Sequence, residues 1–148
     1  MPSEIGVRPI EILMVDDSPG DVRLAKEALK DSKLESNISV VEDGVEAMDF
    51  LYKRGNYTEA IRPDLILLDL NMPRKDGREV LAEIKSDENL RRIPIVILTI
   101  SSDEADILKT YDKHANCYIV KPIDLNLFLD VVKAIENFWL SIVKLPPE

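Results

Sequence analysis

Short apolar runs alternate along the chain with longer stretches in which apolar residues recur at helical spacing. The runs predict strands at residues 11–16, 38–42, 64–69, 94–99 and 117–121. A helical stretch follows each run, which is the rhythm of βα units and predicts an α/β fold with a parallel sheet. The third and fourth runs are apolar between their end residues, as expected of central strands covered on both faces.

The helices can be placed by their start signals and by the spacing of their apolar residues. Ser18 is the expected N-cap of the first helix, with Pro19 at its first position. The third helix is expected to begin near Asp76, the fourth near Ser102 and the fifth after Asp124. The spacing predicts these core positions: Val22, Ala25, Leu29, Ala47, Met48, Leu51, Val80, Leu81, Ile84, Ile107, Leu108, Tyr111, Phe128, Val131, Val132, Ile135 and Phe138. We expect residues 53–63, between the second helix and the third strand, to form an exposed loop.

Four of the predicted strands end on polar side chains that suit phosphate chemistry. Asp16 and Asp17 close the first strand, and Asp69 closes the third. Thr99 closes the fourth strand and Lys121 the fifth. Each residue alone has an ordinary structural explanation, such as a helix cap or a turn. All of them nevertheless fall at carboxyl ends, which in an open parallel sheet share the edge where ligands bind.

Three carboxylates and a lysine at one edge predict a Mg2+ site beside a reactive carboxylate. Mg2+ prefers oxygen ligands, which Asp16 and Asp17 supply. Asp69 can attack phosphorus and form an acyl phosphate while the metal neutralises the phosphoryl oxygens. Lys121 would place a fixed positive charge beside the phosphoryl group, and the Thr99 hydroxyl would donate a hydrogen bond to it.

Composition narrows the class of protein. The 148 residues suit one domain, and the net charge of -9 opposes binding to nucleic acid or to an anionic membrane. No apolar run approaches the roughly 18 residues of a membrane-spanning helix. Cys117 is the single cysteine, so no internal disulfide can form, and residues 1–9 lack the apolar core of a signal peptide. These features favour a cytoplasmic location.

The chain resembles the receiver domains of two-component response regulators. The motifs that carry the likeness are Val15-Asp16-Asp17, Leu68-Asp69-Leu70-Asn71-Met72-Pro73 followed by Asp76-Gly77, Leu98-Thr99, and Tyr118-Ile119-Val120-Lys121-Pro122. The likeness covers residues 10–138, between an N-terminal extension (1–9) and a C-terminal extension (139–148). It implies a doubly wound, five-stranded parallel sheet, the (βα)5 flavodoxin-like receiver fold, with strand order 2-1-3-4-5.

The resemblance also implies a role for each residue of the site. Asp69 matches the phosphoacceptor, which receives its phosphoryl group from a histidine kinase, and such a protein is not an enzyme with turnover. Asp16 and Asp17 match the acidic pair that holds Mg2+, together with Asp69 and the backbone carbonyl of Asn71. Thr99 and Lys121 match the hydroxyl and lysine that sense phosphate. Tyr118 matches the aromatic residue that turns inward on phosphorylation.

A narrower likeness is to the single-domain regulators that partner bacterial phytochromes and related histidine kinases. It rests on residues 53–57, 113–118 and 138–140. Ten residues follow Phe138, too few for a DNA-binding output domain, so we expect output through protein contacts. We expect a homodimer through the face of the fourth helix, fifth strand and fifth helix, joined by the apolar tail (Trp139, Ile142, Val143 and Leu145). The alternative is that the tail folds back on its own domain.

Other classes of protein fit the residues less well. A phosphatase of the haloacid dehalogenase type needs a second Asp two residues after its nucleophile as general acid, and Asn71 stands there. A nucleotide- or flavin-binding module would need a glycine-rich phosphate loop, and the chain has neither G-x-G-x-x-G nor G-x-x-x-x-G-K-[ST]. A receiver used as a phosphate-independent scaffold remains open, because every reactive residue is present.

Overall fold

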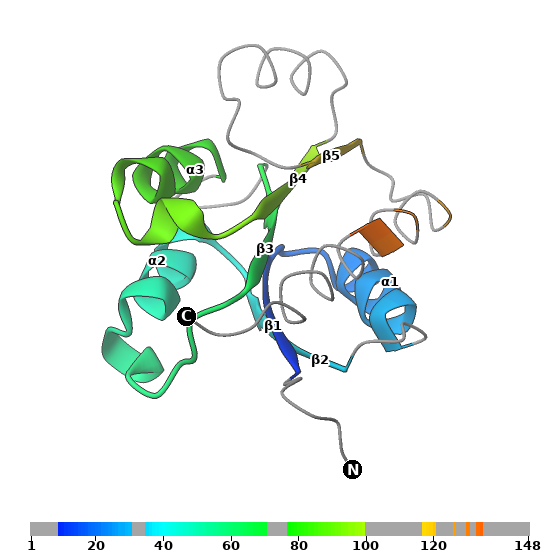
Figure 1. Cartoon of the computed structure of the whole chain (residues 1–148), viewed down its shortest axis with the longest axis horizontal. Coiled ribbons are helices and arrows are strands. Elements are labelled where there is room, and N and C mark those ends of the chain that lie inside the picture. Colours follow the sequence, from blue (N-terminus) through cyan, green and yellow to red (C-terminus); the bar gives the residue numbers. More distant parts are fainter. Residues whose placement is uncertain are drawn as a thin grey trace, which may run out of the picture.

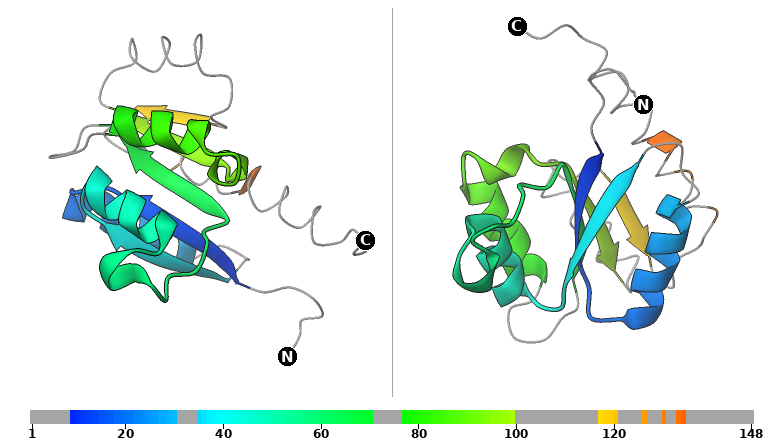
Figure 2. Two further views of the ribbon diagram at one scale, coloured as in Figure 1. Left: turned by 90° about the vertical axis from the view of Figure 1, so that its left-hand side faces the viewer. Right: turned by 90° about the horizontal axis from the view of Figure 1, so that it is seen from below.

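The computed structural model describes residues 9–30, 35–70, 77–99 and 117–120, with 126, 130, 133 and 134 as single helical positions. A five-stranded parallel sheet lies between helix α1 (Pro19–Lys30) on one face and helices α2 (Gly44–Tyr52) and α3 (Gly77–Ser86) on the other (Figure 1, Figure 2). Helices on both faces of a parallel sheet confirm the predicted doubly wound fold. No helix in these residues is long and apolar enough to cross a membrane.

The strand order confirms the order that the resemblance implied. The sheet runs β2-β1-β3-β4-β5, and all four pairings are parallel. Its strands are β1 (Ile10–Val15), β2 (Ser36–Val41), β3 (Leu65–Asp69), β4 (Ile95–Thr99) and β5 (Cys117–Val120). The register places Val15 opposite both Val41 and Leu68, and Thr99 opposite Val120. The carboxyl ends of the strands therefore share one edge of the sheet.

Alternate residues of the central strands pack into two separate cores. In β1, Ile12 and Met14 belong to the cluster that includes Ala25 of α1, whereas Leu13 and Val15 belong to the cluster under α2 and α3. Strands β3 and β4 divide in the same way, and their described core side chains are almost fully buried. Period-two alternation between two covered faces explains why these strands are apolar between their ends.

Side-chain caps explain where the first two helices begin. The Ser18 hydroxyl accepts the backbone N–H of Asp21 at 3.3 Å, which confirms the predicted N-cap of α1. The buried carboxylate of Asp43 accepts the N–H of Glu46 at 2.9 Å and caps α2. The predicted core positions of α1, α2 and α3 are buried, apart from Val22, which is partly buried against the α1-side cluster.

Strand β2 begins two residues before the position that the apolar pattern predicted. Ser36 pairs with Ile10, and the Asn37 side chain donates to Glu11 Oε2 at 2.9 Å. These two residues carry no apolar signal, because β2 is an edge strand and stays partly open to solvent. Pairing with β1, rather than hydrophobicity, extends the strand.

The expectation that residues 53–63 form an exposed loop is wrong in part. The segment contains the short 3-10 helix η1 (Gly55–Tyr57), and Pro63 is buried. The Tyr57 ring is half-buried, with its centroid 5.5 Å from that of Phe50. An aromatic anchor therefore holds this connection against α2. A second 3-10 helix, η2 (Leu90–Arg92), leads into β4.

Several predicted features lie outside the described residues. They are the fourth helix, Asn71, Lys121 and the C-terminal tail, together with all but single positions of the fifth helix. The dimer face predicted from helices four and five and from the tail therefore stays a prediction.

Candidate metal centre

Three carboxylates meet at the carboxyl edge of the sheet. Asp16, Asp17 and Asp69 each offer one carboxylate oxygen, and these oxygens lie within 4.8 Å of one another. Asp16 and Asp69 are buried, whereas Asp17 is exposed. The structure thus brings together the acidic pair after β1 and the aspartate that ends β3, as the sequence predicted.

Strand pairing and a tight turn position Asp16. Its backbone N–H donates to the carbonyl of Val41 at 3.0 Å and continues the pairing of β1 with β2. Its Oδ1 accepts the N–H of Ser18 at 2.8 Å, which stabilises the turn into α1. The structural and metal-binding explanations of this residue are compatible, because a carboxylate has two oxygens and several acceptor sites.

Asp69 is held through its neighbour in the chain. In the register of β3 and β4 it lies opposite Leu98. The next residue, Leu70, is fully buried; its N–H donates to the Leu98 carbonyl at 2.9 Å, and its own carbonyl accepts the N–H of Gly77 at 3.1 Å. Leu70, the residue that follows Asp69, is therefore fixed by β4 through its N–H and by the start of α3 through its carbonyl.

The donor set fits a hard divalent cation. Three carboxylates this close repel one another, and the burial of two of them strengthens the repulsion. Carboxylate oxygens are the ligands that Mg2+ and Mn2+ prefer, and the cluster includes no thiolate or imidazole that would favour zinc. A divalent cation would relieve the repulsion that this arrangement creates.

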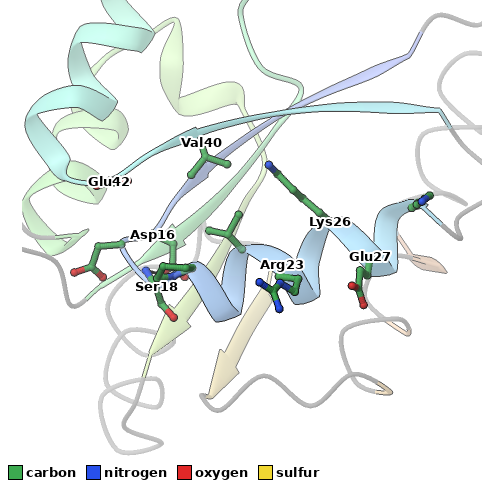
Figure 3. Close-up of a pocket in the computed structure, with 11 residues that line it drawn as sticks. Asp16, Ser18, Arg23, Lys26, Glu27, Val40 and Glu42 are labelled. Carbon is green, nitrogen blue, oxygen red and sulfur yellow. Dashed lines mark hydrogen bonds between the residues drawn. The ribbon is translucent and has the colours of Figure 1, made fainter.

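A groove opens beside the acidic cluster, between α1 and β2. It has a volume of about 590 Å³ and is lined by both Asp16 and Asp17, with Asp16 at one end (Figure 3). Val40 and Lys26 lie on facing walls, and the lysine side chain extends from α1 toward β2. This groove was not predicted from the sequence, although Arg23, Lys26 and Lys30 recur at helical spacing and indicate a basic stripe on the first helix.

The remaining predicted site residues can be placed only by their backbones or not at all. Thr99 ends β4 and pairs with Val120, and Tyr118 lies in β5 opposite Ile97. The side chains of Thr99 and Tyr118 lie outside the described part of the structure, as do Asn71 and Lys121. Their roles in the site stay predictions.

The sequence matches a known family over most of its length. The model of the response regulator receiver domain matches residues 12–133. Response regulator Rcp1 of Synechocystis sp. is 49% identical over 138 residues, which cover 93% of this chain and 94% of Rcp1. Chemotaxis protein CheY-3 of Vibrio cholerae is 32% identical over 113 residues, covering 76% of this chain and 81% of CheY-3.

Solved structures show the same likeness. The phosphorylated cyanobacterial phytochrome response regulator RcpA superposes with a TM-score of 0.78 at 52% identity, covering 95% of this chain and all of RcpA. The Mn2+-bound form of Rcp1 gives a TM-score of 0.77 at 49% identity, covering 94% of this chain and all of that one.

Proposed function

The chain belongs to the response regulator receiver domain family of two-component signalling proteins, and from this premise we propose that Asp69 is its phosphoacceptor. The observation that carries the proposal is the cluster of Asp69 with Asp16 and Asp17, whose oxygens lie within 4.8 Å of one another. A nucleophilic carboxylate beside two metal-ligating carboxylates is the set of groups that acyl phosphate formation needs.

The position of Asp69 in the sheet favours it as the nucleophile. Asp17 is exposed, and Asp16 follows β1, which lies farther from β4 and β5 than β3 does. Asp69 ends the central strand β3, one register position before Thr99 on β4. Its carboxylate oxygen forms the new bond to phosphorus while the bond from phosphorus to the donor breaks, and the leaving group keeps the electron pair. With a phosphohistidine donor, the leaving group is an imidazole that takes up a proton.

The other residues would bind and read the phosphoryl group. Asp16, Asp17, Asp69 and the Asn71 carbonyl would hold Mg2+, which when bound supplies positive charge against the phosphoryl oxygens. In the proposal the Thr99 hydroxyl and the Lys121 ammonium contact the same oxygens, and Tyr118 changes position with Thr99. The protein is then a phosphoacceptor with two conformational states rather than an enzyme with turnover.

The proposed donor is a histidine kinase of the phytochrome type. The support is similarity: RcpA is described as a cyanobacterial phytochrome response regulator, and it is 52% identical to this chain. We also propose a homodimer through the face of the fourth helix, β5 and the fifth helix, with the C-terminal tail. Light scattering at micromolar concentration tests the dimer, and a monomer both with and without phosphorylation would contradict it.

Intact-mass measurement after incubation with Mg2+ and acetyl phosphate tests the function itself. We expect a single phosphoryl adduct in the unmodified protein and in Asp49→Asn, a control on α2, and no adduct in Asp69→Asn. Chelation of Mg2+ should abolish the adduct. Labelling that persists in Asp69→Asn would refute the assignment of the acceptor. Absence of labelling in every variant, also with a phosphorylated histidine kinase as donor, would favour the phosphate-independent scaffold.

A further inference from the structure

We propose that Gly77 is a positioning residue for Asp69, because its lack of a side chain lets the start of α3 press directly on the peptide after the acceptor. The inference rests on the proposed function of Asp69. The absence of a side chain at Gly77 would thus help to fix the position of the Asp69 carboxylate without contacting that carboxylate. Residue 77 would then influence metal binding from outside the metal site.

The space around Gly77 is closed by backbone. A Cβ atom added there would lie 2.5 Å from the Cα of Leu70 and 2.9 Å from the carbonyl carbon of Asp69, and closer still to the Asp69 carbonyl oxygen. Real Cβ atoms essentially never approach other heavy atoms so closely. A flexible side chain could rotate away from such a contact, whereas a strand backbone cannot. Any side chain at position 77 must therefore displace either α3 or the peptide between Asp69 and Leu70.

Hydrogen bonds and core packing hold the start of α3 and the end of β3 in place where they meet at Gly77. The Gly77 N–H donates to the Leu70 carbonyl at 3.1 Å, and the Leu70 N–H donates to the Leu98 carbonyl at 2.9 Å. Leu70 is fully buried in the core that also takes Val80 of α3. Close-packed interiors transmit such a displacement instead of absorbing it. The shift would reach the Asp69 carboxylate, whose oxygen is one of the three within 4.8 Å.

Space, and not an unusual backbone angle, accounts for glycine at this position. Gly77 is the first residue of α3 and does not have a left-handed φ. Gly55 shows the opposite case, with φ of +58° and nothing within 4 Å of an added Cβ. An alanine at position 77 could adopt the local backbone, and alanine favours a helix over glycine. A substitution therefore tests the close approach alone.

The experiment compares Gly77→Ala with Gly20→Ala. Gly20 lies in the first turn of α1 at the same edge of the sheet, and its added Cβ would meet only Ser18 Oγ at 4.0 Å. Mg2+ affinity is measured by isothermal titration calorimetry, and the rise of Tm with Mg2+ is measured in parallel. We expect Mg2+ binding to weaken roughly 10–100-fold in Gly77→Ala, as when other groups that orient metal ligands are removed, and to stay unchanged in Gly20→Ala.

The Mg2+ dependence separates positioning from a merely structural role. A structural role would lower Tm by the same amount with and without Mg2+ and leave the affinity of the folded protein unchanged, and this result would overturn the inference. A Gly77→Ala chain that is unfolded even at saturating Mg2+ would also overturn it, because Gly77 would then be a general requirement for folding. If neither the unmodified protein nor Gly20→Ala bound Mg2+, the proposed metal site itself would be refuted.

Discussion

The backbone N–H of Leu70 donates a 2.9 Å hydrogen bond to the carbonyl of Leu98. This bond joins the residue after Asp69 to the residue before Thr99, so the ends of β3 and β4 are fixed to each other at the acidic edge. Under the proposed function, a phosphoryl group on Asp69 would therefore act on the same hydrogen-bonded unit that carries Thr99. Such a connection would suit a two-state switch biased by phosphorylation.

Asp16→Asn should separate the metal-binding role of this residue from its structural role. The asparagine Oδ1 can still accept the Ser18 N–H that Asp16 accepts at 2.8 Å. One negative charge leaves a cluster of three, so the metal-free variant should be as stable as the unmodified protein or slightly more stable. The stabilisation by Mg2+, about 2.7 kcal/mol at roughly 100 times Kd, should largely disappear.

Thermal unfolding with and without Mg2+ checks this prediction. Asp49→Asn is the matched control, since Asp49 forms a 3.2 Å ion pair with Arg54 on the outside of α2, away from the cluster. The control should keep the full Mg2+ shift. A full shift in Asp16→Asn would mean that Asp16 is not a metal ligand.

The sequence predicted the cluster of three carboxylates, but it did not predict the backbone contacts that hold Asp69 in position. Asp16, Asp17 and Asp69 follow apolar runs, and parallel strands bring their carboxyl ends to one edge, so residue order was sufficient. Strand order came from the resemblance to a family, because periodicity carries no information about which strands are neighbours. The contact of Gly77 with the Asp69 backbone could not be predicted, because it depends on how closely α3 approaches β3.

The helix cap at Asp43 provides a stability prediction. Its carboxylate, buried in the fold, accepts the Glu46 N–H at 2.9 Å and begins α2. Asp43→Ala removes that acceptor and should lower the free energy of unfolding by about 1 kcal/mol. Asp43→Asn keeps an acceptor and should lose less. Urea denaturation measures both, and equal losses would show that the charge matters rather than the cap.

The contact between Phe50 and Tyr57 should stabilise the connection between α2 and β3. Their ring centroids lie 5.5 Å apart at an interplanar angle of 54°, within the range of favourable aromatic pairs. A double-mutant cycle with Phe50→Leu and Tyr57→Leu should give a coupling energy of about 0.5–1.5 kcal/mol. Additive effects of the two substitutions would show that η1 is held by other contacts.

The stability that Asp87 contributes to the folded protein should be lost in acid. Hydrogen bonds from the N–H groups of Leu90 and Asn89 lower the pKa of its carboxyl below the ordinary 3.8, and the Tyr52 hydroxyl adds a smaller effect in the same direction. Because the folded-state pKa is depressed, the contribution of Asp87 is fully present above the ordinary pKa. It is lost as the pH falls through the lowered value, where the folded protein also takes up the proton.

Asp87→Asn tests this contribution, since asparagine keeps an acceptor for the Leu90 and Asn89 N–H groups but does not titrate as Asp does. The urea midpoint of each protein is measured from neutral pH down to below the ordinary pKa of Asp. The unmodified protein should lose more stability than Asp87→Asn over the acidic part of this range. Identical acid profiles for the two proteins would show that the hydrogen bonds from Leu90 and Asn89 do not lower the pKa of the Asp87 carboxyl.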